Sequence, residues 1–183
     1  VSIQSMTKAD TADADAVLEQ IKRCVIAGAD IMRVAIPRRD VLDGFQRICE
    51  ESPVPIVADI HFDYRLAVEA ARRGAAKLRI NPGNIGDDER MARVIEAARE
   101  ADIPIRVGVN AGSLEKDLLE TYGAPTAQAC ADSALRSVQR MVDLGFDNLV
   151  VSIKASDVYR TVAANRLFAQ GNDYPIHLGV TEA

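Results

Sequence analysis

The 183-residue sequence lacks the features that mark several protein classes. No apolar run approaches the ~18–20 residues that a membrane span requires. The first residues show no signal-peptide pattern. The net charge of −5 argues against a general nucleic-acid surface, although a local basic pocket is still compatible with it. We therefore expect a cytoplasmic protein that binds neither nucleic acid nor a membrane.

Two common cofactor motifs are missing as well. No G-x-G-x-x-G opens a helix, which disfavours a dinucleotide site. The three cysteines, Cys24, Cys49 and Cys130, lie far apart and form no C-x-x-C pair, so they indicate neither a zinc nor an iron–sulfur site. Because free cysteine is among the most buried residue types, we expect buried or half-buried thiols in a reducing compartment.

The sequence does contain a regular alternation of strand and helix patterns. The candidate strands are residues 1–4, 31–36, 56–60, 77–80, 105–109, 149–153 and 176–180. Amphipathic helical patterns cover residues 11–27, 41–50, 64–73, 87–101, 126–144 and 156–170, and a short extra helix is expected within residues 111–125. This alternation is typical of an α/β fold with a parallel sheet and helices outside it.

A weak internal repeat supports this interpretation. PIVAD at 55–59, PIRVG at 104–108 and PIHLG at 175–179 each place a proline just before a candidate strand. Repeated units of this size suit either a (β/α)₈ barrel or an open doubly wound sheet. Both chain ends fall next to strand patterns, so we expect a fragment of a longer protein.

Four candidate strands carry a cation where a covered parallel sheet is usually apolar. These cations are Arg33, Arg79, Arg106 and Lys154. Burying an unpaired guanidinium costs at least several kcal/mol, so each needs a partner. Asp59 can pair with one of them, and the simplest partner for the rest is a multiply charged anion. The arginine fork suits phosphate oxygens, so a diphosphate is favoured.

Residues at the carboxyl ends of the strands extend this candidate site. Active sites of barrels collect at these ends, where His61, Asn81, Asn110 and Glu182 are found. Other interpretations stay open. Each arginine alone could belong to a structural ion pair, and Asp59-x-His61 could be part of a metal site, although no third ligand is evident. His177 suits a hydrogen-bonded core position as well as a ligand site.

Several long motifs resemble the 4-hydroxy-3-methylbut-2-enyl diphosphate synthase family. They are IQSMTKADTAD, MRVAIP, VADIHFDYRLA, KLRINPGNIG, IRVGVNAGSLEKDLL, GFDNLVVSIKASDV and YPIHLGVTEA, and together they run from end to end of the chain. The resemblance implies a TIM (β/α)₈-type barrel, truncated here to about seven strands, as a single incomplete substrate-binding domain over residues 1–183. The family's C-terminal domain, which carries a [4Fe–4S] cluster, would be absent.

The resemblance also implies an activity, partners and residue roles. The family reductively opens a cyclic diphosphate of methylerythritol in isoprenoid biosynthesis, with electrons from flavodoxin or ferredoxin, and works as a homodimer. By position, Arg33, His61, Arg79, Arg106 and Lys154 match its diphosphate-binding residues, and Asp59, Asn81 and Asn110 match its polar pocket residues. Glu182 matches a glutamate implicated in protonation or dehydration.

The main departure is that the family's cluster ligands are missing from these residues. We therefore expect no cofactor in this chain and no catalysis by the chain alone. Two rival functions remain: a pterin-binding barrel similar to dihydropteroate synthase, and a structural or dimerisation module whose strand cations are paired internally. The three interpretations differ in the ligand that they predict: a diphosphate for the synthase family, a pterin for the first rival and neither ligand for the second.

Overall fold

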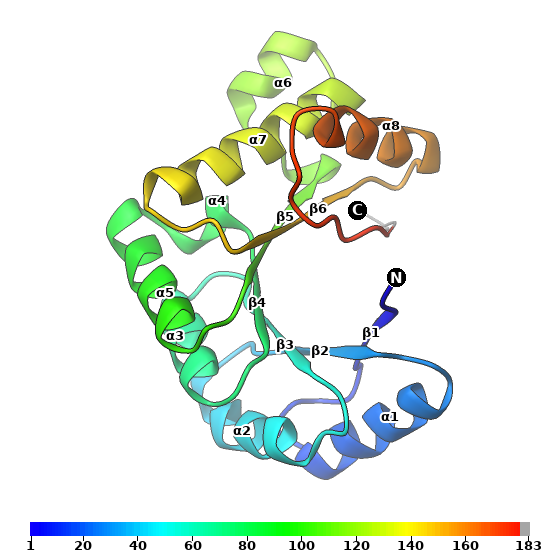
Figure 1. The fold of residues 1–183 in the computed structure, drawn as a ribbon, viewed down its shortest axis with the longest axis vertical. Helices are drawn as coiled ribbons and strands as arrows, with labels where there is room; N and C mark the ends of the chain where they lie inside the picture. The colour runs from blue at the N-terminus through cyan, green and yellow to red at the C-terminus, as the bar shows by residue number, and fades with distance from the viewer. Residues whose placement is uncertain (180–183) are drawn as a thin grey trace. The chain divides into compact units, whose positions relative to one another are not determined.

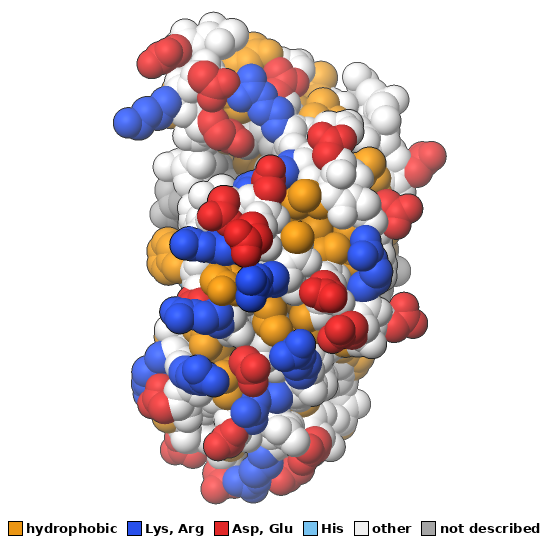
Figure 2. Space-filling model, turned by 90° about the vertical axis from the view of Figure 1, so that its left-hand side faces the viewer, with side chains coloured by type: hydrophobic (Ala, Val, Ile, Leu, Met, Phe, Trp, Pro, Cys, Tyr) orange, Lys and Arg blue, Asp and Glu red, His pale blue; other side chains and the backbone are white. Residues whose placement is uncertain are grey.

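The computed structural model describes residues 1–179. The chain divides into two compact units. The first unit contains residues Val1–Ile80 and Asn84–Ile105, and the second contains Asn81–Gly83 and Arg106–Ala183. None of the helices within residues 1–179 is long and apolar enough to cross a membrane. Figure 2 shows basic and acidic side chains interleaved over one face of the molecule, with smaller apolar areas between them.

The first unit is a parallel sheet whose strands follow chain order. The strands are β1 (Gln4–Met6), β2 (Ile31–Ala35), β3 (Ile56–Asp59) and β4 (Lys77–Ile80). Parallel neighbours need a crossover connection, which usually contains a helix. The helices are α1 (Ala14–Ile26), α2 (Leu42–Glu51), α3 (Tyr64–Arg72) and α5 (Asp88–Glu100). Figure 1 shows them along one side of these strands.

Local sequence signals set where the helices begin and end. Asp13 and Asp63 cap α1 and α3, because each side chain accepts a hydrogen bond from a backbone N–H of the first turn. Gly28 and Gly74 follow these helices with positive φ angles of 104° and 90°, a conformation that glycine adopts without strain. Both glycines lie in the turns that lead from these helices to the next strands.

The second unit contains β5 (Ile105–Asn110) from Arg106 onward and β6 (Leu149–Lys154), and these two strands are neighbours in the sheet order. Its helices are α6 (Lys116–Tyr122), α7 (Ala127–Asp143) and α8 (Val158–Ala169). Helix α7 packs against both α8 and β6. The short extra helix expected within residues 111–125 is confirmed as α6. Three single-turn elements complete the described chain: η1 (Arg39–Val41), α4 (Pro82–Ile85) and η2 (Ala111–Ser113).

The expectation of about seven strands is wrong for the described residues, which contain six. In the segment predicted as a strand at 176–180, only Ile176 forms a bridge, parallel to Val151. Two hydrogen bonds tie this bridge, from Val151 N to the oxygen of Pro175 and from His177 N to the oxygen of Val151. Within residues 1–179 the ladder ends there, and Leu178 is 71% exposed. Residue 180 lies outside the described residues.

Candidate functional site

Asp59 is the centre of a charged cluster in the first unit. It is the last residue of β3 and is only 2% exposed. Its Oδ1 lies 3.0 Å from Nη1 of Arg79, and its Oδ2 lies 3.5 Å from Nε of Arg33. The sequence suggested that Asp59 could serve one cation, whereas the structure gives it two. We call Arg33, Asp59 and Arg79 the Asp59 cluster.

The strand register explains why these side chains meet. Asp59 on β3 is the register partner of Arg79 on β4, and Arg33 on β2 is the partner of Val57, two residues before Asp59. Side chains two residues apart on a strand lie on the same face. The cluster is therefore built by rigid strands, with loops only at its edge.

One such edge residue is His61, just after β3. Its side chain is 53% exposed, and its Nε2 lies 3.6 Å from Oδ2 of Asp59. The imidazole adds a positive charge to the cluster only when it is protonated. His61 therefore joins the cluster as its most solvent-exposed member and could reach a ligand from the solvent side.

Charge within the cluster is not balanced, because two guanidinium groups face one carboxylate. Burial lowers the pKa of Arg33, Asp59 opposes that shift, and the positive charge of Arg79 adds to it. Arginine ordinarily titrates above pH 12, so Arg33 still carries its charge at neutral pH. A net positive cluster at the carboxyl ends of parallel strands can attract an anion.

Met6 is a member of this region that sequence reasoning missed. It is the register partner of Arg33, and its sulfur accepts hydrogen bonds from Nη2 of Arg33 at 2.7 Å and from Nε at 3.2 Å. The first strand was expected at residues 1–4 but is formed by Gln4–Met6. That shift hid the contact, since Met6 fell outside the expected strand.

The loop after β4 belongs to the second unit and is held in two ways. Oδ1 of Asn81 accepts a hydrogen bond from the backbone N–H of Gly83 at 3.0 Å, which forms a tight turn. Nη1 of Arg140, on α7, donates to the carbonyl oxygen of Pro82 at 2.8 Å. Arg140 was not predicted, because nothing local in the sequence connects it to a loop 58 residues away.

Among the predicted site residues that the structure describes, Arg106 is the most deeply buried, at 1% exposure. It lies on β5, and its Nη1 is 3.1 Å from Nδ1 of His177. Because a guanidinium can only donate, Nδ1 of His177 acts as the acceptor in this contact. Of the two interpretations of His177, the structure favours the hydrogen-bonded one.

Lys154 and Asn110 end the two strands of the second unit. Lys154 is the last residue of β6 and is half-buried. Its Nζ lies close to Gly179, because a Cβ added to that glycine would be only 3.4 Å from this nitrogen. Asn110 is the last residue of β5, and its carbonyl oxygen accepts a hydrogen bond from the hydroxyl of Ser113. Glu182, the predicted catalytic residue, lies outside the described residues.

The cysteines are far from forming a metal site. Cys24, Cys49 and Cys130 are free thiols on α1, α2 and α7, half-buried in the first two cases and buried in the third, as expected. Burial raises the pKa of Cys49 to about 12, so this thiol stays protonated at neutral pH. Within residues 1–179 no three His, Cys, Asp or Glu side chains come together in a way that could hold a metal ion.

Comparison with known families supplies the identity of the fold. A family model described as the GcpE TIM-barrel domain matches residues 1–183. The chain belongs to the GcpE TIM-barrel domain family. Its fold is therefore α/β and of the TIM-barrel type, with six strands in the described part.

Two curated relatives of this GcpE-family chain carry the same name. The chain is 54% identical over 183 residues to a protein of Idiomarina loihiensis, of which it covers 49%. It is also 54% identical to a protein of Azotobacter vinelandii, of which it covers 50%. Both are named 4-hydroxy-3-methylbut-2-en-1-yl diphosphate synthase (flavodoxin), and in both cases all of this chain is matched. The chain thus spans about half the length of these relatives.

Solved structures with a similar fold are found at low sequence identity. The Yersinia pestis dihydropteroate synthase gives a TM-score of 0.59 at 16% identity, covering 82% of this chain and 56% of that one. The 3-dehydroquinate dehydratase of Geobacillus kaustophilus gives a TM-score of 0.67 at 12% identity, covering 96% and 71%. At such identity the likeness concerns the fold alone.

Proposed function

We propose that these 183 residues form the substrate-binding TIM-barrel domain of a 4-hydroxy-3-methylbut-2-enyl diphosphate synthase. That oxidoreductase of isoprenoid biosynthesis reductively opens 2-C-methylerythritol 2,4-cyclodiphosphate. The family match and the shared name of the relatives support the proposal. The observation that carries it is the Asp59 cluster, in which Arg33 and Arg79 share one buried carboxylate.

The cluster suits a diphosphate for electrostatic reasons. Asp59 holds both guanidinium groups near one another but neutralises only one of them. A ligand with several negative oxygens adds the missing charge, and planar guanidinium groups bind phosphate oxygens in pairs. His61 is exposed beside the cluster and adds a further donor. In this proposal Asp59 orients the two arginines and has little direct contact with the phosphates, since like charges repel.

The remaining predicted residues belong to the second unit. We propose that Arg106 and Lys154 add positive charge for the substrate, and that Asn81 and Asn110 donate hydrogen bonds to it. Glu182 is proposed to deliver a proton to the departing hydroxyl, a role that suits a carboxylic acid next to the reacting group.

Electron transfer in this reaction requires a redox centre, which the described residues do not provide. Their cysteines lie on separate helices, and no metal-ligand group forms among residues 1–179. A [4Fe–4S] cluster does not fit here, and in this proposal another part of a longer protein holds it. We further propose flavodoxin, named for the relatives, as electron donor, with ferredoxin as a substitute, and a cytoplasmic homodimer as the working form.

Calorimetry separates this function from the rival ones. The full-length protein is titrated with the cyclic diphosphate and, separately, with a pterin. Saturable binding of the cyclic diphosphate alone supports the proposal, and binding of the pterin alone shows a pterin-binding barrel. Binding of neither ligand leaves a structural module. The 183-residue chain by itself is expected to bind the cyclic diphosphate without turning it over when an electron donor is added.

A further inference from the structure

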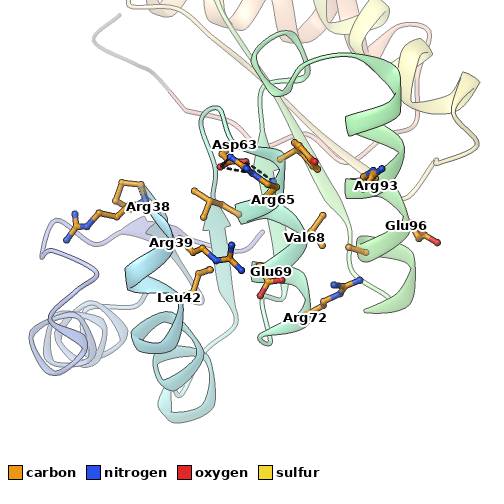
Figure 3. Close-up of a pocket in the computed structure, with 14 residues that line it drawn as sticks. Arg38, Arg39, Leu42, Asp63, Arg65, Val68, Glu69, Arg72, Arg93 and Glu96 are labelled. Carbon is orange, nitrogen blue, oxygen red and sulfur yellow. Dashed lines mark hydrogen bonds and ion pairs between the residues drawn. The ribbon is translucent and has the colours of Figure 1, made fainter.

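We propose that a second pocket, on the helical side of the first unit, binds a small organic phosphate with an apolar body. The pocket has a volume of about 760 Å³ and is lined by Pro37, Arg38, Arg39, Leu42, Asp63, Tyr64, Arg65, Leu66, Val68, Glu69, Arg72, Arg93, Glu96 and Ala97 (Figure 3). None of these is a predicted substrate-binding residue. The inference therefore stands apart from the proposed function.

The pocket, which we call the outer pocket, is rich in arginine. Five arginines and three carboxylates line it, in a chain whose net charge is −5. Two of the carboxylates already have partners. Asp63 forms an ion pair with Arg65 at 2.9 Å, and Glu69 forms one with Arg73 at 3.5 Å. Four of the arginines have carboxylate partners as well: Arg65 pairs with Asp63, Arg38 with Asp40, Arg72 with Glu100 and Arg93 with Glu89. Among the described residues, Arg39 is the lining arginine that remains, and its charge makes the outer pocket suitable for an anion.

Arg39 is the group best placed to anchor that anion. Figure 3 shows its side chain extending from η1 toward Val68 and Glu69 on α3. Within residues 1–179 its guanidinium has no hydrogen-bond or ion-pair partner. The pKa of the Asp63 carboxyl is lowered chiefly by its hydrogen bond with Arg65, and Arg39 adds the smallest contribution, through space. All donors of Arg39 are therefore available, in the fork geometry that matches phosphate.

The apolar residues of the lining indicate that the ligand has an apolar body besides its phosphate. Leu42 and Ala97 are each 2% exposed and Leu66 is 7% exposed, so they form a buried apolar floor of the outer pocket. Val68 and Tyr64 lie half-buried on α3 beside them. A cavity of this size falls in the range of small-molecule sites, which combine apolar walls with a few charged groups. A bare phosphate ion would leave this floor uncovered.

Methyl NMR of the full-length protein locates the binding directly. The probes are phenyl phosphate, inorganic phosphate and an acidic peptide, and the methyl groups of Leu42 and Val68 report on the outer pocket. We expect phenyl phosphate to shift both methyl signals saturably and to bind more tightly than inorganic phosphate. Absence of these shifts, equal affinity for the two phosphates, or saturable binding of the acidic peptide alone would each overturn the proposal.

Three variants make the test specific. Arg39→Ala is expected to weaken phenyl phosphate binding by about tenfold, the loss of a charge-assisted hydrogen bond. Glu96→Gln, which removes a negative charge from the lining, should tighten it by about twofold. Arg23→Ala removes an exposed arginine of α1 outside the lining and should change nothing. If Arg39→Ala binds as the Arg23→Ala control does, the assignment is wrong.

Discussion

The two units hold their strand cations in different ways. In the first, Arg33 and Arg79 are 19% and 13% exposed and lie on either side of one buried carboxylate, that of Asp59. In the second, Arg106 is 1% exposed and donates to a neutral nitrogen of His177. A carboxylate both orients its arginines and neutralises part of their charge. A neutral imidazole nitrogen orients its arginine without neutralising it. Mutations should therefore affect the two units unequally.

The largest expected effect is that of Asp59→Asn. This change keeps the shape of the side chain but leaves two partly buried guanidinium groups facing each other without a carboxylate. Removing one partner of a buried ion pair typically destabilises by about 3–5 kcal/mol, and we expect the lower end because the arginines are partly exposed. Urea unfolding measures the loss. Asp147→Asn, at an exposed position, is the matched control and should change stability by less than about 0.5 kcal/mol.

Arg106→Met is expected to destabilise less than Asp59→Asn does. The change removes the buried charge itself, and unbranched methionine adapts to the space that the arginine stem leaves. Replacing buried ionic groups by apolar side chains is often nearly neutral, so we expect a loss below about 2 kcal/mol in the same urea experiment. A loss larger than that of Asp59→Asn would reverse the contrast between the units.

Arg140→Met tests how the second unit holds its loop at residues 81–83. The variant removes the hydrogen bond to the carbonyl oxygen of Pro82. A hydrogen bond from a charged guanidinium contributes about 1.5 kcal/mol at the low end of its range, which corresponds to roughly tenfold faster amide exchange if the loop opens locally. Hydrogen exchange at the amide of Gly83 is the measurement. An unchanged rate at Gly83 would show that the turn made by Asn81 holds the loop without Arg140.

Met6→Leu should have the smallest effect. Leucine keeps the apolar volume but cannot accept the hydrogen bonds from Arg33. Sulfur is a weak acceptor, so we expect a stability loss of at most about 0.5 kcal/mol and a small rise in the KM for the cyclic diphosphate. A KM change as large as that of Arg33→Met would mean that Met6 is the main group orienting Arg33.

Part of this arrangement follows from the sequence and part does not. Strand β4 was predicted at its observed bounds, Lys77–Ile80, because KLRI is set off by a helix pattern before it and Asn81-Pro82-Gly83 after it. The sequence also puts Asp59 and His61 two residues apart, a spacing that places side chains on the same face of a strand. The sharing of Asp59 by two arginines depends on register between strands, which local patterns do not encode.

Other features escaped sequence reasoning for similar reasons. The outer pocket results from how α2, α3 and α5 pack, and its arginines look like ordinary surface charges along the chain. No seventh strand forms within residues 1–179. There the segment around Ile176 pairs on one side only, through its bridge to Val151. Tertiary pairing decides such features, since the local pattern of a strand is the same with or without neighbours.

Affinity for the cyclic diphosphate tests the central claim of the proposed function, that the Asp59 cluster binds this anion. Calorimetry compares Arg79→Ala, Arg106→Met and the exposed control Arg23→Ala in the full-length protein. The account predicts that Arg79→Ala and Arg106→Met each weaken binding by about 1.5–3 kcal/mol, the range for hydrogen bonds to charged groups, while the control binds like the unmodified protein. Unchanged affinity in Arg79→Ala would remove the Asp59 cluster from the site and contradict the account.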